Sequence, residues 1–345
     1  MTRGEAGDRS VLVTGAGGFV GGHIARGMAA DGCRVVGLTR RTPRVEPGDP
    51  AIDWRIGDLR DPVVRREALR DVRGVVHSAG WVSLGADRSG DSAAVNVDAT
   101  RALMSDAAAA GVERFVYTST LHTVAAGTVE RPADERTPWN LRTVDSPYSR
   151  TKRDAERMVL DGSGGMAGVV ICPGMVLGPR DVKPTSTRVL LLMARSRLAF
   201  LPGGGIPVGD AEVIALAHRR ALESGEPGTR YAVVGPYLAY RLMARLVARI
   251  AGNPRWIAPC PDAFERPVVA VARLAERFLR TGDHFSAAGA AGGFLRLHVS
   301  GRRADEAFGL IHPPPIRSIH AALDDAKRAG RAPWLRIRDL DTIEL

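Results

Sequence analysis

The chain has 345 residues, of which 45% are hydrophobic and 25% charged, and this composition excludes a disordered or fibrous protein. The formal net charge is +10, but the basic residues are scattered along the chain, which favours a solvated basic surface over a nucleic-acid site. The three cysteines are isolated from one another, so neither a disulfide framework nor a metal site is expected.

The polar N-terminal segment, residues 1–10, has no apolar stretch of the kind found in signal peptides. Apolar runs elsewhere are interrupted before the ~20 residues that a membrane span requires. We therefore expect a cytoplasmic protein with no membrane partner and no nucleic-acid partner. Cys33, Cys172 and Cys260 are each expected to be small buried residues.

The first half of the chain alternates short apolar runs with helical stretches. The apolar runs predict strands at about 11–14, 34–38, 51–56, 75–77, 114–118 and 168–172. Helices are predicted between them, at about 19–30, 62–70, 91–110 and 148–160. This alternation is typical of the α/β class, and specifically of a doubly wound parallel sheet, the Rossmann fold.

Beyond Pro173 the alternation weakens. Helices are predicted at about 188–196, 212–223, 238–251 and 266–280, with one strand near 231–234 and a glycine-rich loop at 287–293. We therefore predict a sheet-containing domain at residues 8–180 and a smaller, mainly helical C-terminal substrate lobe at 181–345, the two interleaving as one compact unit.

A glycine-rich turn, Thr14-Gly15-Ala16-Gly17-Gly18-Phe19-Val20-Gly21, joins the first predicted strand to the first helix. Glycines at these positions let the chain turn tightly and bring backbone N–H groups close to a pyrophosphate. The N-terminus of the helix adds a partial positive charge. Because the turn lies between a strand and a helix near the N-terminus, it indicates a dinucleotide-binding site.

The end of the second predicted strand indicates which dinucleotide is bound. An NAD site usually has an acidic residue there, which accepts hydrogen bonds from the ribose 2′-hydroxyl. This sequence has Thr39 followed by Arg40 and Arg41. A guanidinium group suits a 2′-phosphate, so we expect NADP in preference to NAD.

Tyr148 and Lys152 are four residues apart in a predicted helix, so their side chains share one face. An ammonium group near a phenol favours the phenolate, and we expect Lys152 to lower the pKa of Tyr148 in this way. Only three of the 48 basic residues are lysines, and one of them stands at this position. The pair is typical of a proton donor and acceptor in hydride transfer.

Three motifs follow one another along the chain: the glycine turn, the segment Thr118-Ser119-Thr120 and the Tyr148–Lys152 pair. In this order and spacing they resemble the extended (atypical) short-chain dehydrogenases/reductases of the NAD-dependent epimerase/dehydratase family. The resemblance implies that Tyr148 is the general acid/base, that Lys152 assists it, and that Thr120 polarises the substrate oxygen. Ser119 is the alternative to Thr120.

The same resemblance implies the contacts of the cofactor. Asp58, in Gly57-Asp58-Leu59, would approach the adenine, and Ala79 would lie beside the cofactor after the fourth strand. Pro173 begins the segment that would meet the nicotinamide amide. The full expected cofactor-binding set is Gly15, Gly18, Phe19, Val20, Gly21, Arg40, Asp58, Leu59, Ala79, Lys152 and Pro173.

The segment at 178–185 resembles the branch of the family that contains dihydroflavonol-reductase-like and hopanoid-associated epimerase-like proteins. Sugar-nucleotide members commonly have Arg and Tyr where this chain has Cys172 and Leu177. Both replacements make the region more apolar, which favours an apolar substrate. The pocket candidates are Trp81, Trp139 and Met175.

We therefore expect an NAD(P)-dependent ketone reductase or alcohol dehydrogenase that acts on an apolar carbonyl compound. A nucleotide-sugar epimerase or dehydratase is the alternative among enzymes. A non-catalytic NAD(P)-binding regulator is the alternative outside them, although a regulator has no use for an activated phenol. The expected partner is a small-molecule substrate, and the resemblance implies a homodimer through the helices at 91–110 and 148–160.

Overall fold

The structure is a computed structural model that describes residues 10–83, 85, 87, 89–162, 164–182, 186–195, 198–252, 256–278 and 286–342. Residues 183–185 of the segment at 178–185 lie outside the described residues, as do residue 196 and residues 279–280 at the ends of two expected helices.

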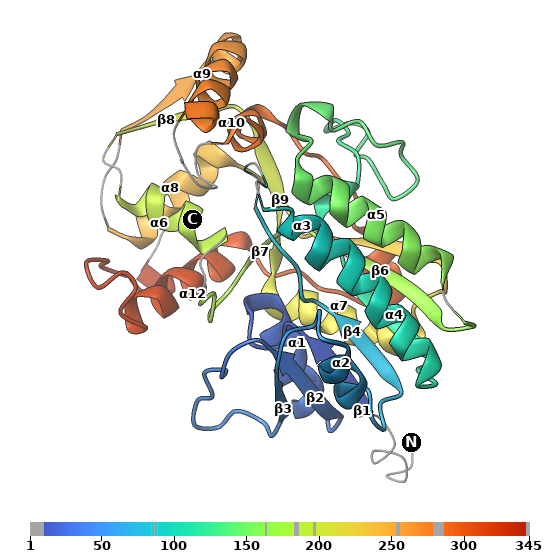
Figure 1. Ribbon diagram of the computed structural model, residues 1–345. Helices are drawn as coiled ribbons and strands as arrows, with labels where there is room; N and C mark the ends of the chain where they lie inside the picture. Colours follow the sequence, from blue (N-terminus) through green and yellow to red (C-terminus); the bar gives the residue numbers. More distant parts are fainter. Residues whose placement is uncertain are drawn as a thin grey trace.

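Seven parallel strands form the central sheet in the order β10-β6-β5-β4-β1-β2-β3 (Figure 1). Their bounds are β1 Ser10–Thr14, β2 Arg34–Thr39, β3 Asp53–Ile56, β4 Gly74–His77, β5 Arg114–Thr118, β6 Ala167–Pro173 and β10 Thr229–Val233. The prediction of a doubly wound parallel sheet is confirmed. The order reverses between β1 and β4, and ligands of such sheets bind at the carboxyl ends of the strands beside this point.

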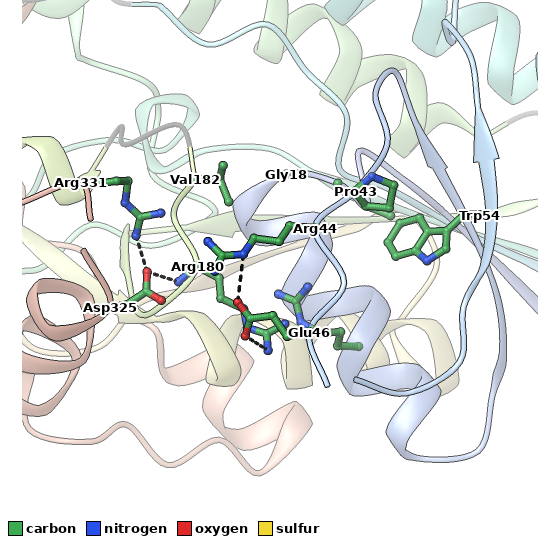
Figure 2. A pocket seen from close by; sticks show the side chains of 12 residues that line it. Gly18, Pro43, Arg44, Glu46, Trp54, Arg180, Val182, Asp325 and Arg331 are labelled. Carbon is green, nitrogen blue, oxygen red and sulfur yellow. Dashed lines mark hydrogen bonds and ion pairs between the residues drawn. The ribbon is translucent and has the colours of Figure 1, made fainter. Parts of the chain in front are cut away.

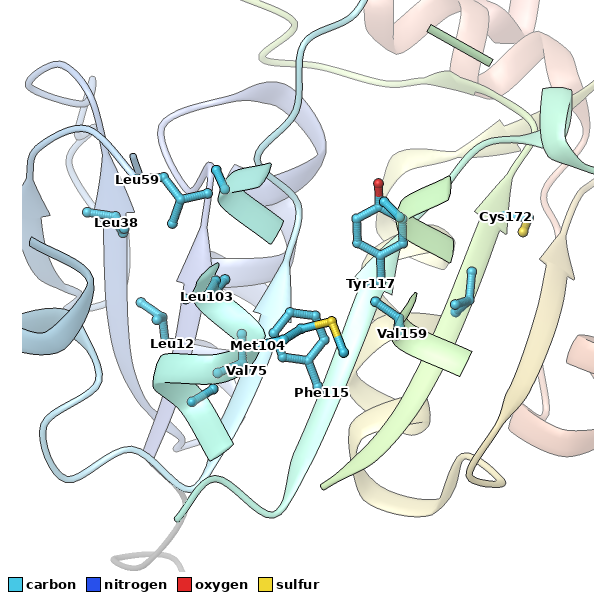
Figure 3. Packing of buried hydrophobic residues seen from close by; sticks show 14 of the residues in the cluster. Leu12, Leu38, Leu59, Val75, Leu103, Met104, Phe115, Tyr117, Val159 and Cys172 are labelled. Atoms are coloured by element: carbon cyan, nitrogen blue, oxygen red, sulfur yellow. The ribbon is translucent and has the colours of Figure 1, made fainter. Parts of the chain in front are cut away.

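Helices cover both faces of the sheet, as the alternation of side chains along the strands requires. Phe115 and Tyr117 of β5 face one core, whereas Val116 between them faces the other. The first core includes Leu103 and Val159 from the helices above it, as Figure 3 shows. The helices on that face are α2 Pro62–Ala68, α4 Ala99–Ala109 and α5 Pro147–Asp161, and those on the other are α1 Phe19–Ala30, α7 Ala211–Ser224 and α11 Arg302–Phe308.

The start of α5 is fixed by its own sequence. The Ser146 hydroxyl accepts a hydrogen bond from the Ser149 N–H (3.2 Å), and the Ser149 hydroxyl accepts one from the Ser146 N–H (2.9 Å). Pro147 fills the first helical position, where no N–H is needed. These interactions place Tyr148 in the first turn of α5.

The predicted helix at 91–110 is interrupted by a wide turn. It consists of α3 (Asp91–Ala93), a π-helical segment (Ala94–Asp98) and α4. Such segments are rare and occur frequently at functional sites.

The C-terminal lobe is built on three helices, α6 (Ser186–Arg195), α8 (Tyr240–Ile250) and α12 (Pro315–Arg328). It also contains short strands that the sequence did not predict. These are β7 Met175–Leu177, β9 Gly205–Asp210 and β11 Tyr237–Ala239 in one sheet, and β8 Leu198–Pro202 and β12 Trp256–Cys260 in another. The second half of the chain also returns to the first, because α7 and β10 complete the Rossmann layers.

The glycine-rich segment at 287–293 was predicted as a loop, and this prediction is wrong. It forms helix α10 (Ala287–Phe294), which packs against α9 (Glu265–Phe278). The Ser286 hydroxyl accepts a hydrogen bond from the Gly289 N–H (2.9 Å), and Ala291 and Phe294 are buried. The N-cap and tertiary packing therefore overcome the low helix propensity of glycine. Among the described helices, none is both long and apolar enough to cross a membrane.

Candidate active site

The glycine turn folds so tightly that side chains are excluded from it. Gly15 has a φ of +70°, and a Cβ atom there would lie 2.8 Å from the backbone of Ala79. A Cβ on Gly21 would lie 2.4 Å from the carbonyl oxygen of Gly15. Helix α1 begins directly after Gly18, which provides no side-chain cap, and its first turn has no acidic residue. Ala16 and Gly18 donate their N–H groups to the Leu38 and Gly15 carbonyls, whereas the first N–H groups of α1 have no acceptor within the helix. These N–H groups can receive a phosphate, and the residues present fit a dinucleotide.

A buried chain of hydrogen bonds ties the glycine turn to the end of β4. The Thr100 hydroxyl donates to the Asn96 carbonyl (2.8 Å), so it accepts from Nε2–H of His77 (2.8 Å). Nδ1 of His77 then accepts from the Thr14 hydroxyl (2.6 Å), whose oxygen accepts from the Ala79 N–H (3.2 Å). Burial lowers the pKa of His77 to about 3, so the ring is neutral and serves as a rigid spacer.

The expected cofactor-binding residues all lie along the carboxyl edge of the sheet or beside it. Arg40 follows β2 and is exposed, and Thr39 before it contacts the turn, since a Cβ on Gly17 would lie 2.3 Å from its hydroxyl oxygen. Asp58 follows β3, and its carboxylate is paired with Arg60 (2.7 Å). The hydrogen bonds from Arg60 lower the pKa of Asp58 to about 2. Leu59, which is also in the expected cofactor-binding set, is buried in the core.

Lys152 is buried, and its ammonium group has few partners. Its Nζ donates to the Thr118 carbonyl (2.8 Å) and lies 4.6 Å from the centre of the Tyr117 ring. Burial lowers the pKa of Lys152 to about 7. A Cβ on Gly80 would lie 3.2 Å from Nζ, so the loop after β4 forms one wall around this group.

Tyr148 and Thr120 are brought together, as the sequence predicts. Both are buried, and a hydrogen bond from the Thr120 side chain to Tyr148 favours the phenolate. Burial is the larger effect, so the pKa of Tyr148 is raised. The expectation that the pKa of Tyr148 lies below its ordinary value is therefore wrong, because desolvation of the phenolate outweighs the favourable hydrogen bond from Thr120.

Ser119, the alternative to Thr120, points away from Tyr148. Its hydroxyl donates to Oε2 of Glu156 (2.8 Å), whose other oxygen accepts from Nη1 of Arg230 (2.9 Å). Successive side chains alternate at the end of β5, so only one of the two hydroxyls can face the tyrosine. Ser119 therefore belongs to a partly buried ion-paired network, and Thr120 is the hydroxyl that lies beside Tyr148.

Asn96 is a residue of the site that the sequence analysis missed. It lies in the π-helical segment and is buried. Its side chain accepts from the Trp81 N–H (2.7 Å) and donates to the Trp81 carbonyl (3.0 Å) and to the Thr151 hydroxyl (3.1 Å). It thus fastens the loop after β4 to helix α5. The sequence carries no periodicity signal for a π turn, so the position could not be recognised.

The residues from which an apolar substrate was predicted are less exposed to a pocket than expected. Cys172 and Leu177 are fully buried, so neither faces a pocket directly, and Arg230 supplies a guanidinium beside Glu156 and Cys172. Cys33 and Cys260, unlike Cys172, are only partly buried. Trp139 is held by a hydrogen bond to the His122 carbonyl (3.0 Å) and by the Arg153 guanidinium 3.6 Å from its ring centre. Trp81 and Met175 are half-buried.

A small cavity of about 30 Å³ lies beside the glycine turn (Figure 2). Arg180 lies on its wall in a left-handed conformation (φ +65°) and pairs with Glu46 (2.7 Å) and Asp49 (2.8 Å). Its N–H donates to Asp325 of α12 (2.8 Å). This cluster binds the C-terminal lobe to the loop after β2. Arg44, a wall residue that the sequence analysis did not select, adds a further cation near Arg40 in the chain.

The chain belongs to the NAD dependent epimerase/dehydratase family, whose model matches residues 11–213. It is 30% identical to sterol demethylase protein B of Methylococcus capsulatus, over 96% of this chain and 99% of that protein. It is 31% identical to 2-alkyl-3-oxoalkanoate reductase of Stenotrophomonas maltophilia, over 63% of this chain and 66% of that one. The crystal structure of gox2253 superposes with a TM-score of 0.79 at 28% identity, over 94% and 99% of the two chains. The expected family is therefore confirmed.

Replacing Lys152 with methionine should stabilise the apoprotein at neutral pH. The pKa of Lys152 is lower in the folded chain than in the unfolded chain, about 7 against 10.5. The unfolded chain therefore binds more protons between these values, and the unfolding free energy of the wild type should rise by about 1.4 kcal/mol per pH unit there. Lys152→Met should lose this slope. The gain over wild type should be largest at pH 7 and below, and it should vanish toward pH 10.

Urea denaturation at several pH values measures this effect. Lys327→Met is the matched control, because it removes an exposed lysine from α12 and should leave the slope unchanged. Equal slopes in the wild type and Lys152→Met would show that the ammonium group is not buried as described.

Proposed function

We propose that this protein is an NADP-dependent reductase of an apolar ketone, or the corresponding alcohol dehydrogenase. The observation that carries the proposal is the buried pair of Tyr148 and Thr120 beside Lys152, next to a glycine turn that fits a dinucleotide. The proposal is consistent with membership of a family of NAD-dependent enzymes.

In this proposal each residue has one task. The chemistry that a bound nicotinamide cofactor supplies is hydride transfer to the carbonyl carbon. Thr120 donates a hydrogen bond to the carbonyl oxygen and holds it beside Tyr148. The phenol O–H bond of Tyr148 breaks, and its proton passes to that oxygen to complete the alcohol. Lys152, held on the Thr118 carbonyl, stabilises the phenolate that remains.

The raised pKa of Tyr148 is consistent with its role as proton donor. Because burial raises this pKa, the phenol is protonated at neutral pH and has a proton to give to the substrate oxygen.

Two relatives support an apolar carbonyl substrate. Their names refer to a sterol and to an alkyl-substituted oxoalkanoate. On this chain, Cys172 and Leu177 are fully buried, so the support for this substrate class comes from the relatives. A nucleotide-sugar epimerase would use the same Tyr–Lys pair, so the substrate class must be decided by measurement.

We expect NADPH oxidation with apolar ketones and no binding of nucleotide sugars. A panel of steroid, polycyclic and long-chain 3-oxo compounds tests the first point in a spectrophotometric assay. Titration calorimetry with UDP- and dTDP-sugars tests the second. Micromolar affinity for a nucleotide sugar, with no turnover of any ketone, would favour the epimerase instead.

Tyr148→Phe should lower turnover of the best ketone by about 10²–10⁴-fold, because it keeps the ring and removes only the transferable proton. Cofactor affinity should stay within a few-fold of the wild type. Tyr237→Phe is the matched control, since Tyr237 stacks on His298 in the C-terminal lobe. Retention of more than about half of the wild-type rate by Tyr148→Phe would show that another group transfers the proton.

NADPH should bind more tightly than NADH, mainly through Arg40. A charge-assisted contact to the 2′-phosphate contributes roughly 1.5–3 kcal/mol, or about ten- to a hundredfold in affinity. Arg40 is exposed, so the preference should lie near the lower end and fall with added salt. Arg40→Ala should weaken NADPH far more than NADH. Arg34→Ala, an exposed arginine at the other end of β2, is the control. A wild type that prefers NADH would refute the assignment.

A further inference from the structure

Helix α9 and the small sheet of β8 and β12 lie at one extremity of the C-terminal lobe (Figure 1). Together they expose an apolar surface. We call it the apolar tip. Its members are large hydrophobic side chains with high exposed fractions: Trp256 80%, Phe200 68%, Val271 67%, Leu274 59%, Phe264 54% and Val268 39%. No other part of the described chain exposes a phenylalanine to this extent.

The exposed apolar side chains of α9, together with Phe264 directly before it, share one face of the helix. Phe264, Val268 and Val271 follow one another at intervals of four and three residues, and Leu274 comes three residues later. The protein itself covers a different face, where Ala272 is buried and Val269 packs against the core. The exposed face is therefore not the inner side of an amphipathic helix. It is a second apolar face, and water contact with it is costly.

The tip continues from α9 onto the small sheet. Trp256 lies on β12, and the 3-10 turn Asp262–Phe264 leads directly from β12 into α9. Phe200 lies on β8, where its register partner Ala258 is two residues from Trp256, so both aromatic rings are on one face of this sheet. Two aromatic rings and an aliphatic helix face thus occur together at one end of the molecule.

Positive charge accompanies this surface. Arg266 and Arg273 of α9 are exposed, seven residues apart on one side of the helix, and neither forms an ion pair with any residue that the structure describes. Two of the nearby carboxylates are engaged elsewhere: Asp262 pairs with Arg296 (2.7 Å), and Glu276 accepts from the Ala287 N–H (3.0 Å). Glu265 is a third, at the first position of α9. Exposed Arg241 and Arg245 add to this charge from α8, which packs against β8 and β12.

We propose that the apolar tip docks on the surface of an anionic lipid bilayer. A helix with one apolar face, arginines beside it and aromatic residues at its end lies in the interface between headgroups and acyl chains. The arginines then meet anionic headgroups, and the ring of Trp256 occupies the interfacial layer that tryptophan prefers. The contact is peripheral, so it agrees with the absence of a spanning helix among the described residues. It revises the expectation of no membrane partner, which considered only spanning segments.

A second copy of the chain fits this surface less well. In a two-fold dimer the same patch faces itself, so Arg266 and Arg273 of one copy would approach those of the other. Like charges at an interface are unfavourable unless acidic groups separate them, and Asp262 is already paired. An anionic lipid surface provides the missing negative charge.

Co-sedimentation of the full chain with phosphatidylcholine vesicles, with and without phosphatidylglycerol, tests the proposal. The wild type should bind the anionic vesicles, and added salt should weaken this binding. Val271→Asp should lower the partition coefficient about tenfold or more. Arg266→Gln with Arg273→Gln should lower it about ten- to thirtyfold, since each arginine near an anionic surface contributes roughly fivefold.

Matched controls change the same residue types elsewhere. Ile311→Asp alters a side chain that is 86% exposed outside the tip, and Arg66→Gln with Arg70→Gln removes two exposed arginines of the N-terminal half. Both should bind vesicles as the wild type does. All altered side chains are exposed, and circular dichroism checks that each variant is folded.

Failure of the wild type to bind anionic vesicles would overturn the proposal, as would equal binding by the tip variants and the controls. A dimer seen by light scattering that Val271→Asp dissociates, without vesicle binding, would assign the tip to a second copy. The measurement is of lipid binding alone, so its outcome is independent of the proposed reaction.

Discussion

The buried ammonium group of Lys152 is the constraint on which the site depends. It has one close acceptor, the Thr118 carbonyl at the end of β5, and the face of the Tyr117 ring as its other support. A charged group with so few partners is costly to bury, and the pKa of about 7 reflects this cost. The residues around Nζ of Lys152 must therefore be held in fixed positions. Gly80 leaves room for Nζ, and Asn96 holds the loop that contains Gly80 against α5.

The ends of the strands separate polar groups into two sets with different roles. Thr120 faces Tyr148, whereas Ser119 faces Glu156 and, through it, Arg230 of β10. The second set is a partly buried ion pair, and it joins α5 to the edge strand that comes from the second half of the chain. On the other side, neutral His77 links the glycine turn to the π-helical segment. Hydrogen-bonded networks thus flank Tyr148 and Thr120 on both sides.

Much of this arrangement could be predicted from the sequence, because the signals were local. The glycine turn and the i, i+4 spacing of Tyr148 and Lys152 depend on a few neighbouring residues. The choice of Thr120 over Ser119 came from the resemblance to the family and not from local residues, since it depends on the direction in which β5 ends. Arg230 and Asn96 were missed because their partners are far away in the chain or lie in a π turn. Helix α10 was missed because packing on α9 overrides the propensity of its glycines.

Packed contacts connect the C-terminal lobe to the start of α5, where Tyr148 lies. Helix α10 packs on α9 and also on the 3-10 turn Arg142–Val144, which immediately precedes the Ser146 cap of α5. Tyr148 lies in the first turn of that helix, so its position depends on how the cap is held. Two packed contacts therefore link α9 to the start of α5. For an apolar substrate dissolved in a bilayer, contact between the proposed apolar tip and that bilayer would bring the source of substrate to the lobe that packs against the start of α5, where the proposed proton donor Tyr148 lies.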